Sequence, residues 1–428
     1  MGLNPMMKSV PNSRKENLFI LLSAILIAVA LYVSFYQWRE QRMSTNWMAP
    51  FLSAAQHLDP AQRAFLMDLD DIEKFKSLDD TALEDTYLFS SSGTTQAYTY
   101  YPIGYPYLIK AATLVFPFVG HQVAIILLQC LFHLLLCLGL LSHRTLSFRV
   151  RVLFLILYAL NPIVLRVATL NFYYFWQVIP SFGLLYLLLH IKSKIGWLLT
   201  LLSLPFALLA RSTTIFISAG FLGYLFWVRS RAGAIAYTIL LAGVVSWLYV
   251  SNDKNPWHTL YAGVGGYANP DKIALSDESS YALYQKHTGI PLNPSIGGNF
   301  YDPVVQKKYT AITRQEYIAV LQEHPVLLAK NAVAYFFAAF SVGYVNKAPD
   351  WLNYLIALSG LVFFILLAYH KKYLLLAWMI LGIGGFVFYY PPIPAYMYGN
   401  YVLLAWGLIE IIDTYLPART AGLFRRVP

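Results

Sequence analysis

Charged residues are scarce in this chain, and cysteine is nearly absent. Asp, Glu, Lys and Arg make up 12% of the 428 residues, whereas hydrophobic residues make up 58% and the mean hydropathy is +0.53. A soluble globular domain carries roughly twice that share of charge, so the composition argues against a soluble fold. The two cysteines, Cys130 and Cys137, lie in one apolar run, which argues against a disulfide framework and a cysteine metal site.

Signatures of several enzyme classes are also missing. The chain has no HExxH motif, no P-loop and no GxGxxG helix signature, and the stretch 263–266 follows no apolar strand, so it is predicted to be a turn. No internal repeat or low-complexity tract is visible, and one transmembrane domain over residues 1–428 is expected. The basic residues behind the net charge of +10 occur in short clusters between apolar runs, so nucleic acid is not an expected partner.

Long apolar runs dominate what is present. A helix needs about 20 mostly apolar residues to cross the hydrocarbon core of a membrane. We therefore expect an all-α polytopic membrane protein with about ten transmembrane helices, at 18–36, 119–142, 150–168, 169–190, 195–210, 212–228, 232–251, 351–369, 373–390 and 394–415.

The distribution of charge predicts the topology. The first apolar run follows Lys8, Arg14 and Lys15 and lacks a small-residue cleavage site, so it is expected to be an uncleaved anchor with its N-terminus in the cytoplasm. By the positive-inside rule the other basic clusters also face the cytoplasm, and so does the C-terminus. The loops 37–118 and 252–345, which hold most of the acidic residues, are then outside a plasma (inner) membrane. Ten crossings place every basic cluster and both termini in the cytoplasm, and further crossings at 102–118 and 326–345 would conflict with this. These two segments are therefore expected to be interfacial or re-entrant helices.

A few basic residues remain at the expected outer ends of helices: Lys110, Arg166, Arg211, Lys330 and Lys347. An ionisable group at membrane depth usually faces a cavity or a partner, although long side chains also reach the headgroups. Guanidinium groups pair with phosphate in a bidentate fork, so these residues favour a phosphate ligand. Aromatic residues line both loops and fit either a sugar platform or an interfacial belt: Tyr98, Tyr100, Tyr101, Tyr105, Tyr107, Trp257, Tyr261 and Tyr267.

Four segments together carry a family resemblance. They are Tyr100 to Pro106, rich in tyrosine and proline; Asn161-Pro162 with Asn171-Phe172-Tyr173; Leu208 to Thr213, with a basic residue between leucine and serine; and Trp257 to Gly265, followed by Asn269, Asp277 and His324-Pro325. In order and spacing the chain resembles the GT-C class of membrane glycosyltransferases, in a bacterial uncharacterised subgroup. That class takes its sugar from a polyprenyl phosphate.

The resemblance implies a catalytic aspartate shortly after the first helix, where this chain has Asn46. The candidate bases are therefore Glu40, Asp85 and Asp277, with Glu84 as a further acid, because a base must reach the acceptor hydroxyl. The stretch 68–80 is predicted to be a solvated acidic face. His258 could contact phosphate, act as an acid, or be structural. The expected substrate-binding residues are Arg211, Arg166, Lys330, His258, Trp257, Tyr100 and Tyr105.

The resemblance implies a glycosyltransferase that acts at the outer face of the membrane. Its donor would be a polyprenyl-phosphate sugar, its acceptor a glycan, lipid or protein, and its other partners membrane lipids. No cofactor and no protein-bound metal are expected, and a divalent metal requirement stays open. Two alternatives also stay open, namely a flippase or transporter of polyprenyl-linked sugars and an oligosaccharide polymerase or ligase.

Overall fold

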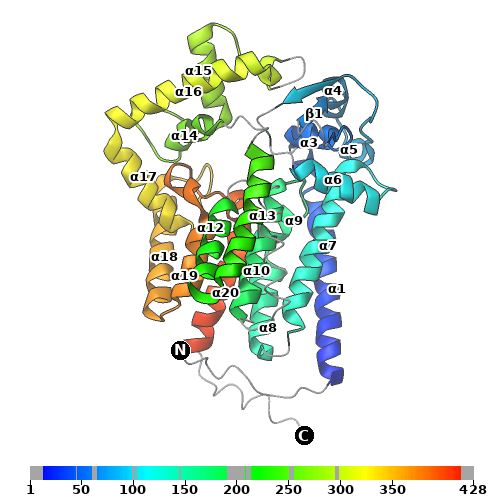
Figure 1. Cartoon of the computed structure of the whole chain (residues 1–428), viewed down its shortest axis with the longest axis vertical. Coiled ribbons are helices and arrows are strands. Elements are labelled where there is room, and N and C mark those ends of the chain that lie inside the picture. Colours follow the sequence, from blue (N-terminus) through cyan, green and yellow to red (C-terminus); the bar gives the residue numbers. More distant parts are fainter. Residues whose placement is uncertain are drawn as a thin grey trace.

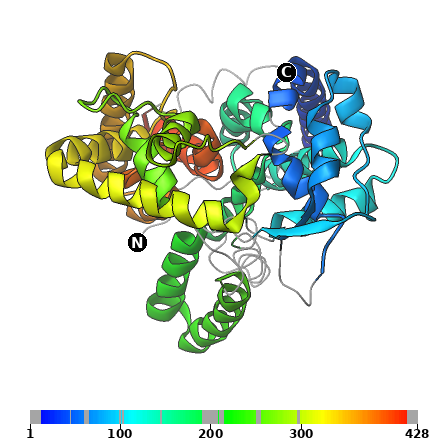
Figure 2. The same cartoon turned by 90° about the horizontal axis from the view of Figure 1, so that it is seen from above.

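The chain forms a bundle of roughly parallel and antiparallel helices with two caps at one end (Figure 1). The computed structural model describes residues 13–44, 46–59, 65–98, 101, 104–143, 146–189, 208, 214–249, 255–294 and 298–415. We call residues 39–115 the first cap and residues 255–323 the second cap. Seen from above, the two caps lie over different parts of the bundle, and α16 (Pro303–Glu323) extends from the second cap toward the first (Figure 2).

Four helices in the described part of the chain are long and apolar enough to cross a membrane. A fifth span results if α8 (Phe148–Phe154), the π-helix η2 (Leu155–Ala159) and α9 (Pro162–Ala168) count as one helix, which bends by 58°. The four long helices are α1 (Ser13–Gln37), α7 (His121–Leu141), α18 (Asp350–Tyr369) and α20 (Pro394–Tyr415). An all-α membrane protein is thus compatible with these helices.

The expectation of about ten spans is wrong as a count of membrane-length helices, since the described residues contain four or five. Most of the other expected spans are helical but short or interrupted, and 195–210 lies outside the described residues apart from Leu208. A count of apolar residues does not detect an interruption such as Gly384, whose φ of +69° ends a helix. The helices found in these other expected spans are η3 (Tyr173–Gln177), α10 (Val178–Leu189), α12 (Ile215–Tyr224), η5 (Leu225–Arg229), α13 (Arg231–Tyr249), α19 (Tyr373–Ile383) and η7 (Gly385–Phe388).

Two buried polar residues of α7 satisfy carbonyl groups at these interruptions. Nε2 of Gln129 donates to the carbonyls of Ala168 (3.3 Å) and Leu170 (2.6 Å), where α9 ends. Nε2 of His133 lies 3.1 Å from the carbonyl of Ala159, where η2 ends. Backbone groups freed by a broken helix need a partner inside a bilayer. The interruptions are therefore supported by specific contacts from the neighbouring helix.

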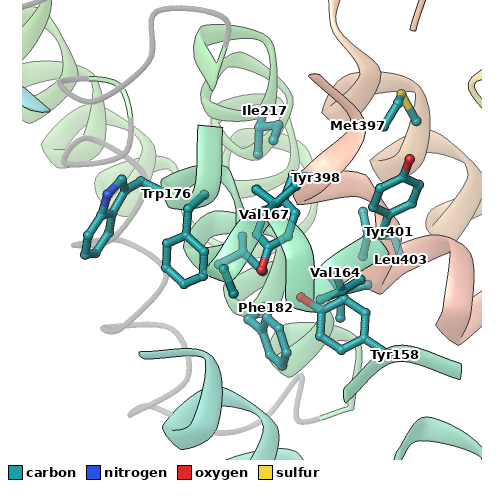
Figure 3. Packing of buried hydrophobic residues seen from close by; sticks show 14 of the residues in the cluster. Tyr158, Val164, Val167, Trp176, Phe182, Ile217, Met397, Tyr398, Tyr401 and Leu403 are labelled. Carbon is teal, nitrogen blue, oxygen red and sulfur yellow. The ribbon is translucent and has the colours of Figure 1, made fainter. Parts of the chain in front are cut away.

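The hydrophobic core of the bundle lies around α20. Figure 3 shows Tyr398, Tyr401 and Leu403 of α20 among Val164 and Val167 of α9, with Tyr158 and Phe182 nearby. All these side chains are buried. Because α20 is the last helix among the described residues and α9 lies in the first half of the chain, the core joins distant parts of the sequence.

The first cap is a small mixed unit. Strands β1 (Phe65–Asp68) and β2 (Thr95–Tyr98) pair antiparallel, with Phe65 opposite Tyr98. Around them are α2 (Arg39–Ser44), η1 (Asn46–Met48), α3 (Ala49–Ala54), α4 (Leu69–Lys76), α5 (Thr81–Thr86) and α6 (Gly104–Val115). Helix α6, in the segment expected to be interfacial, packs against α7, and Nζ of Lys110 donates to Gln56 (3.1 Å).

The acidic stretch 68–80 is not a solvated face throughout. Asp68 is buried and caps α4, accepting from the backbone N–H groups of Asp70 (3.0 Å) and Asp71 (3.2 Å). Asp71 is also buried and accepts hydrogen bonds from the Tyr87 hydroxyl and the Ser90 N–H, both at 2.6 Å. These two carboxylates are structural, because they hold the loop that connects the strands.

The second cap consists of three helices, α14 (Pro256–Val264), α15 (Asp277–Thr288) and α16, with the short η6 (Asn299–Tyr301) before α16. Its own small core contains Leu283, Tyr284, Leu292, Tyr309 and Ile312. After α16 the chain turns at His324 into α17 (Pro325–Ala338), in the second segment expected to be interfacial, and α17 packs along α18.

Candidate functional site

His258 joins the three helices of the second cap. The side chain of Asn255 caps α14 by accepting from the His258 N–H (3.3 Å), which fixes the start of this helix. The His258 ring then lies between two partners: Nδ1 is 2.5 Å from the Tyr309 hydroxyl of α16, and Nε2 is 3.0 Å from Oδ1 of Asp277, the first residue of α15. Tyr281 stacks on the ring at 6.0 Å. Both imidazole nitrogens are therefore engaged.

Asp277 combines an exposed carboxylate with a fixed position. Its side chain is 62% exposed, whereas that of His258 is 23% exposed. Burial acts to raise the pKa of Asp277, but the hydrogen bond and the charge of His258 outweigh this effect, so the pKa of the carboxyl lies below its ordinary value. The carboxylate is thus ionised at neutral pH and open to a ligand.

Tyrosines from both caps and from the bundle surround this end of the second cap. Burial raises the pKa of Tyr101 well above its ordinary value, and the nearby hydroxyls of Tyr301, Tyr98, Tyr281 and Tyr173 raise it further. Burial also raises the pKa of Tyr301 to about 12. The charge of Asp277 acts on the hydroxyls of Tyr281, Tyr309 and Tyr390. We call Tyr98, Tyr101, Tyr173, Tyr281, Tyr301 and Tyr390 the tyrosine shell.

The two caps touch along one seam. Nε2 of Gln96 on β2 donates to the Tyr301 carbonyl (3.0 Å), and Nζ of Lys76 donates to the Pro294 carbonyl (3.3 Å). The rings of Tyr98 and Tyr301 pack edge to face at 5.4 Å. The seam thus lies beside the tyrosine shell and connects segments about 200 residues apart in sequence.

Glycines allow α14 to approach the bundle closely. A Cβ on Gly263 would lie 2.0 Å from the Tyr389 carbonyl oxygen, and the Gly263 carbonyl accepts from the Tyr335 hydroxyl at 2.9 Å. The Tyr344 hydroxyl donates to the Gly266 carbonyl. The predicted turn at 263–266 is in fact the end of α14, which closes at Val264, followed by a turn. These glycines bring the end of α14, the helix that carries His258, against the bundle.

Of the predicted binding cations that the structure describes, neither Arg166 nor Lys330 has a described contact with Asp277. Arg211 lies outside the described residues. Arg166, on α9, stacks on Trp38 at 4.7 Å and donates from Nε to Gln41 (2.9 Å), so it lies beside the end of α1. Nζ of Lys330, an exposed residue of α17, lies 5.0 Å from the ring of Tyr354 on α18.

The other candidate bases lie in the first cap. Glu40 is exposed and lines a shallow groove together with Arg39, Asp79, Asp80, Thr81 and Leu83. Glu84 is fully buried and accepts from Nε2 of Gln122 at 3.3 Å. Asp85 is half-buried at the end of α5, and its carbonyl lies against Gly120. None of these three acids has a described contact with His258 or Asp277.

The predicted aromatic residues divide between core and surface. Tyr105 is fully buried and its hydroxyl donates to Asn171 (2.7 Å), so it is part of the core. Trp257 packs against Arg314 (5.4 Å) and Tyr317 (6.2 Å) of α16. Tyr100 lies outside the described residues, and its neighbour Tyr101 belongs to the tyrosine shell.

One further cluster has ligands suited to a metal. Side-chain ligand atoms of Asp271, Glu323 and His324 lie within 4.8 Å of one another, with Nε2 of His324 3.6 Å from Oδ2 of Asp271. Two carboxylates and an imidazole could hold a divalent cation such as Zn²⁺ or Mn²⁺. Both acids are exposed. The His324–Asp271 ion pair, with Glu323 next to His324 in the sequence, explains the cluster equally well without a metal.

Sequence reasoning missed Tyr309, Tyr281 and Tyr301 in this site. Tyr309 is 51 residues from His258 along the chain, and no spacing within one helix marks it as a partner. No protein-family model, no curated protein and no solved structure matches this chain. Inference about function therefore depends on the geometry of the residues themselves.

Proposed function

We propose that this chain is a membrane glycosyltransferase that moves a sugar from a polyprenyl-phosphate donor to an acceptor hydroxyl at the outer face of the membrane. The observation that carries the proposal is the Asp277 carboxylate, which is exposed, held by His258 at 3.0 Å and flanked by the tyrosine shell where the caps meet the bundle. Apolar helices below and polar caps above suit a lipid-linked substrate with a polar head.

Such a transfer needs a base beside a sugar. The acceptor oxygen attacks the anomeric carbon, the bond from that carbon to the phosphate oxygen breaks, and the phosphate leaves with the electron pair. A general base takes the proton of the acceptor hydroxyl, which contributes roughly 10²–10⁴-fold in rate. Asp277 suits this role because it is ionised and open to a ligand. Tyrosine rings and hydroxyls such as those of Tyr101 and Tyr281 can contact the faces and hydroxyls of a sugar.

The departing phosphate needs a cation. Trp38 contacts the face of the Arg166 guanidinium, and Gln41 accepts a hydrogen bond from its Nε. No described residue bonds its two terminal nitrogens. This edge of a guanidinium is the one that pairs with phosphate oxygens. In this proposal Arg166 is the described candidate for contact with the phosphate, Arg211 supplements it, and Lys330, which packs on Tyr354, has no direct part.

A transporter of polyprenyl-linked sugars is the second candidate. The interruption between η2 and α9 favours it, because discontinuous helices often line transporter sites. Against it, the freed carbonyls are bonded by the side chains of Gln129 and His133 rather than left for a substrate.

One experiment separates these functions. Purified protein in liposomes receives a polyprenyl phosphate bearing a radiolabelled sugar, and both sugar transfer and movement of the donor between leaflets are measured. We expect transfer with release of polyprenyl phosphate, a loss of about 100-fold or more in Asp277→Asn, and no loss in Glu278→Gln on the same exposed turn. Movement between leaflets without transfer would favour the transporter, and equal activity of the two variants would refute the role of Asp277.

A further inference from the structure

The Tyr309 phenol is buried against His258 and Ser280. It is 2% exposed and lies in the small core of the second cap, with its hydroxyl 2.5 Å from Nδ1 of the imidazole. Burial raises the pKa of Tyr309 far above its ordinary value, so the phenol keeps its proton. Ser280, also fully buried, lies beside the phenol oxygen. A substrate contact by Tyr309 is therefore ruled out by its burial.

The proton positions follow from these partners. A phenol that keeps its proton donates it to Nδ1, and an imidazole nitrogen that accepts a hydrogen bond carries no proton of its own. When the imidazole is neutral, its proton is then on Nε2, which donates it to Oδ1 of Asp277 at 3.0 Å. A second partner on the far nitrogen is the usual way in which proteins fix the tautomer of a histidine.

The orientation of the carboxylate depends on this one contact. Among the described residues, His258 is the hydrogen-bond partner of the Asp277 side chain, which is otherwise exposed at the start of α15. In the other tautomer Nε2 would present a lone pair to the carboxylate and repel it. Tyr281, stacked on the imidazole, limits rotation of the ring, so the contact forms only while Nε2 carries a proton.

We propose that Tyr309 is a positioning residue that locks His258 in the tautomer needed to hold Asp277 toward the acceptor hydroxyl. The proposal rests on the proposed function, in which Asp277 is the base. It assigns no contact with substrate to Tyr309 or His258. Tyr309→Phe keeps the aromatic ring in the core but removes the hydroxyl that fixes the tautomer of His258. We therefore expect kcat to fall about tenfold while the KM for the donor stays unchanged.

A pH profile distinguishes this role from simple packing. The groups that interact with Asp277 are His258 from α14, Tyr281 from its own helix, Tyr309 from α16 and Tyr390 from the bundle, and Glu278 is its neighbour in sequence. Only the imidazole lowers the pKa of the carboxyl, while burial raises it. Loss of the Nε2 hydrogen bond therefore raises the pKa of Asp277, and the acid limb of the kcat profile moves to higher pH.

The experiment measures kcat and KM against pH for the reconstituted full chain. Tyr284→Phe is the matched control, because Tyr284 is buried in the same core and packs on Tyr309 at 6.1 Å without touching His258. We expect an upward shift of the acid limb in Tyr309→Phe and a larger one in His258→Leu. His258→Gln, which keeps an N–H donor, should shift it least, and Tyr284→Phe should match the wild type.

The outcomes separate the two proposals. If Tyr309→Phe and Tyr284→Phe share the wild-type profile while Asp277→Asn is inactive, the tautomer lock is wrong and the base assignment stands. If Asp277→Asn is fully active, both are wrong. Should Tyr309→Phe fail to fold, the comparison of His258→Leu with His258→Gln decides, because equal acid limbs in these two variants would overturn the lock.

Discussion

Replacing Gly263 with alanine tests how the second cap docks on the bundle. The added Cβ would lie 2.0 Å from the carbonyl oxygen of Tyr389 and 3.1 Å from the Cα of Tyr390. Normal contact between such atoms is about 3.5 Å, so α14 has to retreat by about 1 Å or more. The obstructing atoms are backbone atoms and cannot rotate away as a side chain could. Overpacking of this kind costs about 1–3 kcal/mol.

The same movement weakens a second contact. The Tyr335 hydroxyl donates to the Gly263 carbonyl at 2.9 Å, and loss of a buried hydrogen bond costs about 1 kcal/mol. We therefore expect Gly263→Ala to be destabilised by about 2–4 kcal/mol in all. Thermal unfolding of the detergent-purified protein measures the loss as a lower midpoint, and limited proteolysis should cut the second cap first.

Gly243 on α13 provides the matched control. A Cβ at this position meets nothing within 4 Å, so Gly243→Ala should be neutral or stabilising by up to about 1 kcal/mol, the gain in helix propensity. Equal unfolding midpoints for Gly263→Ala and Gly243→Ala would show that α14 does not approach Tyr389 as closely as described. The reasoning about docking would then be refuted.

Three further predictions concern the bundle, the seam and the topology. Gln129→Leu leaves the carbonyls of Ala168 and Leu170 without their donor, so the thermal midpoint should fall, by about 1–3 kcal/mol in stability; an unchanged midpoint would contradict the support of the helix break. The double change Lys76→Met and Gln96→Leu removes the two described side-chain hydrogen bonds of the seam and the Lys76 contact with the Tyr301 ring, so spin labels placed one on each cap should report a longer and broader distance; an unchanged distribution would show that contacts between rings hold the described parts of the caps together. Reporter fusions after residues 60 and 280 should report the outer side and fusions after residues 148, 230 and 428 the cytoplasm, and a cytoplasmic signal at 280 would remove the second cap from the proposed site.

Apolar runs predicted where most helices lie but not where they break. The stretch 150–168 reads as one span, yet Pro162 begins a new helix after Asn161, whose side chain caps it by accepting from Ile163 at 2.9 Å. Asparagine followed by proline is a known helix start, so this interruption could have been predicted. The break after α19 was harder to see, because a single glycine, Gly384, gives no comparable signal.

Acidic residues were harder to interpret than apolar ones. Asp68 and Asp71 look like part of a solvated run, but the pattern of an Asp before a helix with a second Asp three residues later also fits an N-cap, which is what the structure has. His258 and Asp277 were each singled out from the sequence, whereas their contact was not. The contact depends on how α14, α15 and α16 pack, and no local pattern encodes that packing.

The most direct test of the account is a single-turnover measurement on Asp277→Asn. The full chain in liposomes is mixed with less than one equivalent of a polyprenyl phosphate bearing a radiolabelled sugar, and the labelled product is followed against wild type and Glu278→Gln. The account predicts that donor binding survives in Asp277→Asn, that the rate of sugar transfer falls about 100-fold or more, and that Glu278→Gln transfers at the wild-type rate. Transfer by Asp277→Asn at the wild-type rate would contradict it.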